Sequence, residues 1–415
     1  MKTTLNKNYR LGLLAGLGML LLFASACTTS AAAQIGEGEA GPTSTPTPFR
    51  PVTQLPATVT PTPTRRPLDV VFPTPTKLAI PTIVALSPYG MVQGMNPLTG
   101  MAAASPELME RRPMAVKISN YPRYVRPQSG LNEADVVFEY YIEGGLTRFI
   151  GIFYGQEAQA VGPVRSGRYF DEHIATMYHS FLVFKYADPR VYNDMLASPL
   201  RDFLVVPGPY TCPWFCQGKN KFDTYNNWYF NTIEWQERAA KIGVDNSKQE
   251  LRGGYFYSLA PLTDQAGQTI YTRYSQDDYN YWDYDSGRQK YVRYQESGRG
   301  SNYELLTDDL NGLPVAFDNI VVIFVPHTFA NNFDEEDEVY HIDLDGAGLA
   351  FLFRDGHAFP AFWHRAAEDQ PLLITDQSGM LLPLKPGTTF FQVISDNSTY
   401  SEAYGEWHFE HRFSE

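Results

Sequence analysis

The sequence predicts an α+β fold, with a mixed sheet, hairpins and a few helices in an N-terminal segment and mainly antiparallel β-structure in a C-terminal segment. Helical patterns occur before about residue 245, whereas strand-like runs rich in Tyr, Val, Ile and Phe dominate from about residue 251. The chain has 415 residues, 43% hydrophobic and 14% aromatic, which is enough for two modest domains with a sizeable core.

The N-terminus has the features of a bacterial secretory signal. A basic leader, Met1–Arg10, precedes the apolar stretch Leu11–Ala26, and small residues lead directly into Cys27. The ending Ala24-Ser25-Ala26-Cys27 is similar to a lipobox, in which the cysteine is lipidated. We therefore expect a signal peptide over 1–27 and an extracytoplasmic protein held to the membrane by lipid at Cys27.

Residues 28–88 predict a tether. They repeat Thr-Pro and lack apolar periodicity, so they cannot bury enough surface to fold. At about 3 Å per residue, an extended proline-rich chain of this length spans on the order of 100–180 Å. That reach could carry a domain from the membrane into wall or surface layers.

An N-terminal α+β segment is expected over 89–245. Glu143-Gly144-Gly145 separates two strand-like runs and predicts a hairpin, and Gly243 marks the end of a helix. The expected strands are Met114–Ser119, Val136–Tyr141, Arg148–Tyr154 and Phe181–Tyr186, and the expected helices are Ser166–His179 and Thr232–Lys241.

A β-rich C-terminal segment is expected over 246–395, followed by a polar tail, 396–415. Asn319–Val325 is continuously apolar, which is typical of a central strand covered on both faces. Asp355-Gly356 predicts a hairpin turn. The other expected strands are Ile270–Ser275, Tyr279–Tyr284, Lys290–Gln295, Gly348–Arg354, Ala358–Arg365, Leu372–Thr375, Met380–Leu384 and Thr389–Ile394.

Cys212 and Cys216 lie four residues apart. This spacing allows a local disulfide, which an extracytoplasmic location would preserve; free thiols and a metal site are the alternatives.

Arginines are concentrated on turns between residues 126 and 171, in a chain of net charge −13. Such an acidic chain is a poor candidate for non-specific nucleic-acid binding, so no nucleic-acid partner is expected. Arginine and serine at the start of a helix are suited to hold an anion. Alternatively, Arg165 and Arg168 pair with Glu139, Glu143 or Asp171 and lock the hairpin to the helix. The predicted ligand-binding residues are Arg126, Gln128, Ser129, Glu143, Thr147, Arg148, Arg165, Ser166, Arg168 and Asn227.

Enzymatic activity is the second interpretation. Glu139 and Glu143 are four residues apart, so on one strand they would share a face and could act as acid and base of a cell-envelope hydrolase or transferase. They could equally be the counter-charges of the arginines. The eight histidines form no HExxH pattern, and neither a metal nor a cofactor is predicted.

A third interpretation rests on the aromatic residues of the C-terminal segment. Tyrosines and Trp282 recur along 271–294, which favours either a binding surface for a cell-wall or envelope protein partner or ordinary cross-strand packing.

The blocks RPQSGL, ADVVFEYYIEGGLTRFIGIF and GPVRSGR resemble the YerB-like bacterial lipoproteins, the DUF3048 family, and the likeness continues through FRDGHAFPAFW and LKPGTTFFQVI. The resemblance implies an extracytoplasmic lipoprotein of two consecutive segments and does not imply an activity. It also leads us to expect a His-Asn pair where this chain has Asn226-Asn227, and a glycine-rich turn after a histidine where it has Lys185–Asp188. These differences count against a shared histidine-dependent mechanism.

Overall fold

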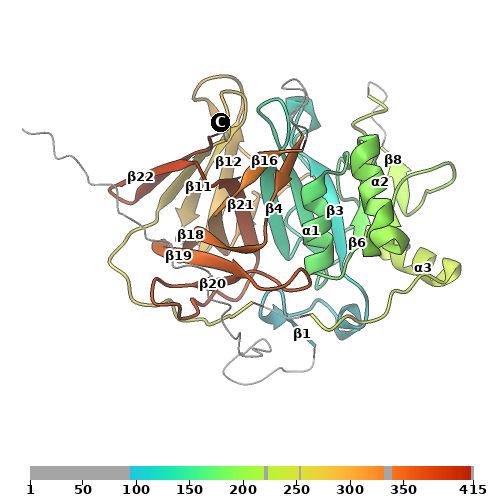
Figure 1. Ribbon diagram of the computed structural model, residues 1–415, viewed down its shortest axis with the longest axis horizontal. Helices are drawn as coiled ribbons and strands as arrows, with labels where there is room; N and C mark the ends of the chain where they lie inside the picture. The colour runs from blue at the N-terminus through green and yellow to red at the C-terminus, as the bar shows by residue number, and fades with distance from the viewer. Residues whose placement is uncertain (1–93, 219–222, 252–253, 331–338, 413–415) are drawn as a thin grey trace, which may run out of the picture. The chain divides into compact units, whose positions relative to one another are not determined.

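The computed structural model describes residues 94–218, 223–251, 254–330 and 339–412. The predicted signal peptide, Cys27 and the tether lie outside the described residues. Within these ranges, helix α1 covers one face of a ten-stranded mixed sheet, and a seven-stranded sheet packs against the other face (Figure 1). The predicted α+β class is therefore confirmed.

The ten-stranded sheet combines strands from both sequence segments. In spatial order its strands are β20 (Leu373–Thr375), β19 (His357–Arg365), β18 (Gly346–Arg354), β15 (Asn319–Val325), β21 (Thr389–Ser395), β4 (Val136–Tyr141), β5 (Thr147–Phe153), β3 (Met114–Ser119), β6 (Phe181–Val183) and β7 (Leu204–Val205).

The seven-stranded sheet is built from the C-terminal part of the chain. Its strands are β13 (Tyr303–Leu305), β12 (Lys290–Glu296), β11 (Tyr279–Asp285), β10 (Thr269–Arg273), β23 (Glu406–Glu410) and β22 (Thr399–Ala403), with β14 (Ala316–Phe317) paired to β12.

The remaining elements are short. The helices are α1 (Tyr169–Met177), α2 (Pro189–Ala197), α3 (Thr232–Ile242) and the 3₁₀ helices η1 (Pro106–Glu110), η2 (Arg123–Val125) and η3 (Pro199–Phe203). Three strand pairs complete the list: β1 (Met95–Asn96) with β2 (Met101–Ala102), β8 (Phe215–Gln217) with β9 (Trp228–Phe230), and β16 (His327–Phe329) with β17 (Tyr340–Ile342).

Strand β21 joins the two sequence segments. It runs parallel to β15 on one side and parallel to β4 on the other. Each of its seven residues is buried, as is each residue of β15 and β4. The prediction that Asn319–Val325 is a strand covered on both faces is therefore confirmed, and the centre of the sheet is made jointly by both segments.

Alternation along β4 sends successive side chains to opposite faces of the sheet. Phe138 and Tyr140 face α1, where the Tyr140 ring lies 4.5 Å from that of Phe170. Glu139 faces the seven-stranded sheet, where it pairs with Arg293 at 2.8 Å. The same alternation decides which of the predicted site residues can meet.

Several predicted boundaries shift for identifiable reasons. Helix α1 begins at Tyr169 rather than Ser166, because the preceding residues pair with the backbone of neighbouring segments. Strand β6 ends at Val183, because Tyr186 adopts a left-handed conformation with φ of 63°. Helix α3 is confirmed to within one residue: it ends at Ile242 and is capped by Gly243, whose φ is 70°.

The C-terminal residues correct the sequence prediction. Residues 399–410, expected to belong to a polar tail, form β22 and β23. Burial alternates along β23, so Trp407 and Phe409 pack against Phe351 at ring-centroid distances of 5.3 Å. Met380–Leu384, expected to be a strand, contributes only isolated bridges.

Candidate functional site

Residues Arg165–Arg168, called here the arginine turn, are held by the backbone of neighbouring segments. The Arg165 N–H donates to the carbonyl of Lys117 at 3.1 Å, and the Gly167 N–H donates to the carbonyl of Tyr186 at 2.9 Å. The turn therefore has a fixed position between the end of β3 and the segment after β6.

Two arginines share one carboxylate beside this turn. Arg168 donates Nε–H to Glu143 Oε2 at 2.8 Å and makes a second hydrogen bond to Oε1, while Arg148 Nη2 lies 3.5 Å from Oε1. Arg148 also donates to the carbonyl of Ser166 at 3.0 Å. Burial raises the pKa of the Glu143 carboxyl, but Arg168 outweighs burial, so this pKa lies below its ordinary value.

The Arg148 guanidinium is unusually placed. It is buried, and burial lowers its pKa to about 9, with the positive charge of Arg168 acting in the same direction. One carboxylate thus serves two guanidinium groups, and this carboxylate is itself 38% exposed.

Arg165 forms no ion pair among the described residues: no carboxylate oxygen lies within 4.0 Å of its guanidinium there, and the more distant Asp223 carboxylate only partly offsets its burial. Its Nε is buried without a hydrogen-bond partner, and its guanidinium packs 4.4 Å from the centroid of the Tyr225 ring. Burial lowers the pKa of Arg165 below its ordinary value. The arginine turn therefore has more positive than negative charge.

A buried lysine is connected to the arginine turn through Asp171, and it was not identified from the sequence. Lys117 Nζ lies 3.0 Å from Asp171 Oδ1, hydrogen-bonds to the Tyr140 hydroxyl, and is wholly buried. Asp171 Oδ2 accepts the Arg168 backbone N–H at 2.8 Å, which fixes the start of α1. Burial lowers the pKa of Lys117 to about 7. A lysine inside the otherwise apolar strand MAVKIS was the available signal.

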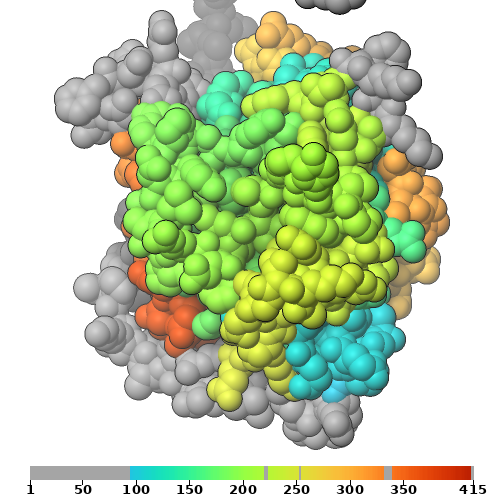
Figure 2. Space-filling model, turned by 90° about the vertical axis from the view of Figure 1, so that its right-hand side faces the viewer, coloured from blue at the N-terminus to red at the C-terminus, as the bar shows by residue number. Residues whose placement is uncertain are grey.

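A pair of exposed tyrosine rings lies next to the arginine turn. This pair was not identified from the sequence. Tyr186 and Tyr225, called here the tyrosine pair, stack with centroids 5.5 Å apart and 19° between ring planes, and they are 54% and 47% exposed. Beside them, Lys185 Nζ donates to the carbonyls of Thr224 and Tyr225 at 3.2 and 2.7 Å. Residues 160–218 and 223–245 form most of the face in Figure 2, in green to yellow.

Arg126 and Gln128 lie on the opposite side of the sheet from the arginine turn and are engaged within the protein. Arg126 donates to the carbonyl and the carboxylate of Glu296, each at 2.7 Å, and to the carbonyl of Asn120 at 3.0 Å. Gln128 is wholly buried and donates to Asn120 and to a strand carbonyl. Their hydrogen bonds give both side chains a structural role.

The remaining predicted donors are also occupied. Ser129 donates its hydroxyl to a backbone carbonyl at 2.6 Å, and Asn227 donates its side-chain amide to another at 2.9 Å. Thr147 bonds Glu139 and Asp278 on the face of the seven-stranded sheet. Arg148, the next residue of β5, points to the opposite face.

Glu139 and Glu143 do not share a face, which corrects the sequence prediction. Strand β4 ends at Tyr141, so alternation does not extend to Glu143. Glu139 is wholly buried against Arg293, whereas Glu143 is partly exposed against Arg168. The two carboxylates therefore cannot act as a pair on one sugar. Glu143 is the counter-charge of Arg148 and Arg168, as the alternative interpretation expected, whereas Glu139 pairs with Arg293, which that interpretation did not name.

The aromatic residues of the C-terminal segment divide between the two faces of the seven-stranded sheet. Trp282 and Tyr291 are buried against the ten-stranded sheet. Tyr271, Tyr281 and Tyr294 are half-buried on the outer face, where Tyr281 stacks on Tyr294 at 4.5 Å and lies 5.2 Å from Tyr271. These contacts are typical of cross-strand packing.

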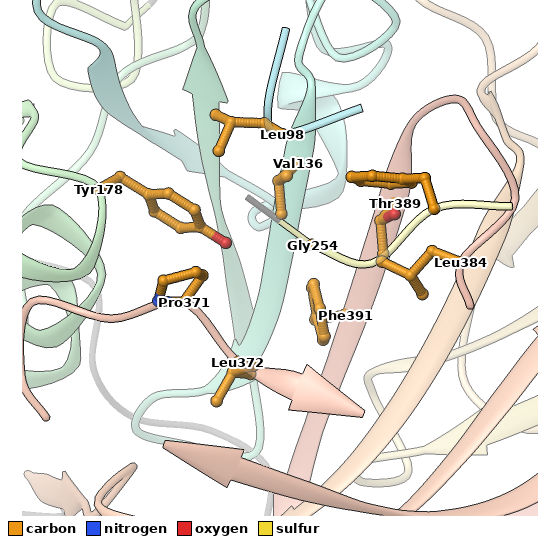
Figure 3. Close-up of a pocket in the computed structure, with 10 residues that line it drawn as sticks. Leu98, Val136, Tyr178, Gly254, Pro371, Leu372, Leu384, Thr389 and Phe391 are labelled. Atoms are coloured by element: carbon orange, nitrogen blue, oxygen red, sulfur yellow. The ribbon is translucent and has the colours of Figure 1, made fainter. Parts of the chain in front are cut away.

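A small cavity of about 20 Å³ lies between the N- and C-terminal segments. In Figure 3 the Tyr178 ring lies on one side of it and Leu384 and Phe391 lie on another, and most of the lining is apolar. This volume corresponds to roughly one water molecule, so the cavity is too small to hold a ligand.

Cys212 and Cys216 form the predicted disulfide. Within the described ranges, no group of three or more His, Cys, Asp or Glu side chains is arranged to hold a metal ion. In the same part of the chain, no helix has the length and apolar character needed to cross a membrane.

Comparisons with known proteins agree on one family. Residues 98–247 match the domain described as "Protein of unknown function (DUF3048) N-terminal domain", and residues 270–391 match its C-terminal counterpart. The chain is 27% identical to "Putative lipoprotein YerB" of Bacillus subtilis (strain 168) over 313 residues, which cover 75% of this chain and 89% of that protein.

A solved structure extends this likeness to the fold. The crystal structure of the YerB protein from Bacillus subtilis matches with a TM-score of 0.59 and 26% sequence identity, covering 72% of this chain and 96% of that one. Both domain matches fall on the segments that together build the central sheet. The chain therefore belongs to the DUF3048 family, to which its blocks RPQSGL, ADVVFEYYIEGGLTRFIGIF and GPVRSGR already show a resemblance.

Proposed function

We propose that this protein is held on the outer side of the cell membrane by lipid at Cys27 and binds an anionic ligand at the arginine turn. The observation that carries the binding proposal is the charge balance: Arg148 and Arg168 share Glu143, and Arg165 has no carboxylate partner among the described residues. This excess of positive charge occurs in a chain of net charge −13.

A purely structural role explains Arg168 better than Arg165. Arg168 makes a bidentate pair with Glu143, which is the geometry of a lock between hairpin and helix. Burial removes part of the hydration of the Arg165 guanidinium, and the Tyr225 ring and the Asp223 charge offset this loss only in part, because the pKa of Arg165 stays below its ordinary value. An incoming carboxylate or phosphate would supply the missing charge, with the planar geometry that arginine favours.

Binding is also favoured over acid–base catalysis at the predicted glutamates. Glu139 is wholly buried between the sheets, and Glu143 is kept ionised by Arg168. A general acid needs a raised pKa and access to the substrate, and neither carboxylate combines the two.

The test is titration of the full chain, purified in detergent micelles, with inorganic phosphate at low ionic strength. We expect binding that is lost in Arg165→Ala. Arg190→Ala is the matched control, because Arg190 is an exposed arginine that already pairs with Asp188 at 2.9 Å. Equal phosphate affinity in wild type and Arg165→Ala would refute the anion site.

The membrane anchor has its own test. Changing Cys27→Ser should move the protein from the membrane fraction to the soluble fraction and abolish incorporation of radiolabelled fatty acid. The name of the YerB relative supports this expectation. An unchanged membrane fraction with no fatty-acid label in either form would contradict it.

A further inference from the structure

We propose that the ligand of the arginine turn is an anionic carbohydrate, whose sugar ring stacks on the tyrosine pair while its carboxylate or phosphate group binds Arg165. This inference rests on the proposed function and adds to it the chemical class of the ligand.

The first argument is adjacency. The Lys185 N–H donates to the carbonyl of Arg165 at 3.0 Å, and Gly167 pairs with Ala187 in a parallel bridge. The segment that bears Tyr186 is thus paired along its backbone with the arginine turn. Because the Arg165 guanidinium packs on Tyr225, a ligand that contacts this guanidinium also reaches the tyrosine pair.

The second argument is that the two rings are held in place although they are exposed. Tyr186 occupies a left-handed conformation that non-glycine residues seldom adopt, and its carbonyl accepts the Gly167 N–H at 2.9 Å. Lys185 fixes the other loop by donating to the carbonyl of Tyr225. Strained backbone is concentrated at functional sites. Two rings about half exposed and already ordered lose little entropy when a ligand packs on them.

The third argument concerns the number of charges on the ligand. The Asp223 carboxylate accepts four hydrogen bonds within the protein, from the Tyr124 hydroxyl, the Asn226 side-chain amide and two backbone N–H groups. Burial opposes ionisation, but these hydrogen bonds lower the pKa of Asp223 to about 2, so the carboxylate is negatively charged. A negative charge next to the rings repels a ligand that carries several negative charges. Two stacked rings beside one guanidinium without a carboxylate partner therefore fit a sugar with a single acidic group.

Lys185 adds to the selectivity for negative charge. Its Nζ lies 4.7 Å from the Tyr186 ring centroid and 4.8 Å from that of Tyr225, so a second cation lies beneath the rings. Positive charge below an aromatic face draws electron density from it and weakens its attraction for a cationic ligand. The surface therefore disfavours basic sugars and basic peptides.

The experiment measures binding of four probes to the full chain in detergent micelles by calorimetry. Galacturonic acid carries one carboxylate on a sugar ring, and glucose 1-phosphate carries one phosphate on a sugar ring. Glycerol phosphate is an anion without a ring, and maltotriose is a sugar without charge. We expect one of the two acidic sugars to bind at least tenfold more tightly than glycerol phosphate, and maltotriose not to bind. The affinities of the two acidic sugars, compared with each other, show whether the site prefers a carboxylate or a phosphate group.

Two variants separate the stacking from the charge. Tyr186→Asn removes the ring but keeps a residue that tolerates the left-handed conformation. Tyr404→Asn is the matched control, because Tyr404 is likewise an exposed tyrosine with a positive φ, of 57°, but lies between β22 and β23. Tyr186→Asn should weaken binding of the acidic sugar about tenfold and leave the affinity for glycerol phosphate unchanged. Arg165→Ala should abolish binding of both ligands. Tyr404→Asn should change neither affinity.

The failures are distinguishable. If every anion binds equally and Tyr186→Asn has no effect while Arg165→Ala abolishes binding, the carbohydrate inference is wrong and the anion site stands. If no probe binds, both proposals are overturned.

Discussion

Two charged clusters lie on opposite faces of the same sheet and differ in whether their charges are matched. On the face of the seven-stranded sheet, the buried carboxylates of Glu139 and Glu296 pair with Arg293 and Arg126 at 2.7–2.8 Å. On the α1 face, the arginine turn leaves Arg165 without a carboxylate partner in the described part of the chain. The first cluster connects two sheets, whereas the second borders an exposed surface. Arginine content alone does not separate a structural cluster from a candidate site.

The largest expected effect comes from breaking the matched cluster. Arg293→Met leaves Glu139 buried without its cation, and removing one partner of a buried ion pair costs about 3–5 kcal/mol. Chemical denaturation of the full chain measures this loss. The double variant Glu139→Leu with Arg293→Met should recover much of it, because no charge then remains unpaired. Unchanged stability of Arg293→Met would mean that this cluster does not hold the sheets together.

The matched cluster should also make the stability of the protein depend on pH. Burial, reinforced by Glu296 and Glu139, raises the pKa of Asp278 to about 8. The native carboxyl keeps its proton up to that pH, whereas the unfolded chain releases it near pH 4. Native protein therefore binds more protons across this window, and stability falls as pH rises from about 4 to about 8.

Asp278→Asn removes this titration. Relative to the variant, wild type should lose on the order of a few kcal/mol between pH 5 and pH 8 in denaturant unfolding. Parallel pH profiles for the two proteins would show that Asp278 is not protonated in the native state.

A smaller effect is expected at the carboxylate beside the arginine turn. Glu143→Gln removes the counter-charge of Arg148 and Arg168, and because Glu143 is partly exposed we expect a loss of only about 1 kcal/mol. Phosphate affinity should rise several-fold, since the ligand no longer competes with Glu143 for the guanidinium groups. Weaker phosphate binding in this variant would instead make Glu143 a contributor to binding, and loss of a turnover reaction would favour the enzymatic interpretation.

The smallest change in stability is expected at Arg165. Arg165→Met keeps the packing on Tyr225 and removes a guanidinium whose Nε lacks a partner, so stability should stay within about 1 kcal/mol of wild type or rise. The same denaturant titration measures it. If Arg165→Met lowered the free energy of unfolding as much as Arg293→Met does, the arginine turn would be as important for stability as the matched cluster, contrary to this prediction.

Local patterns predicted much of the fold. Strands β3, β4 and β15 have the predicted bounds, because continuous apolar runs between turn residues indicate buried strands. Alternation in EWHFE could also have revealed β23, but the surrounding polar residues hid it. Local signals of this kind depend only on neighbours in sequence.

The candidate site needed contacts between distant residues. The sequence indicated Arg165 and Arg168, and it offered Glu143 as a partner only among several carboxylates. The tyrosine pair joins residues 39 positions apart, and the pairing of Lys117 with Asp171 joins residues 54 positions apart. No turn or period links such positions, so they emerge only when the segments after β3 and β6 are packed together.

The position of β21 has a consequence for the making of this protein. Until residues 389–395 have arrived, β4 has no neighbour on one side, and its hydrogen-bonding groups form an open edge. A chain threaded across a membrane from its N-terminus would deliver β4 some 250 residues before the strand that covers it. In such a chain the central sheet could close only after residues 389–395 had crossed, and a chain stopped before residue 389 would expose a strand edge that promotes aggregation.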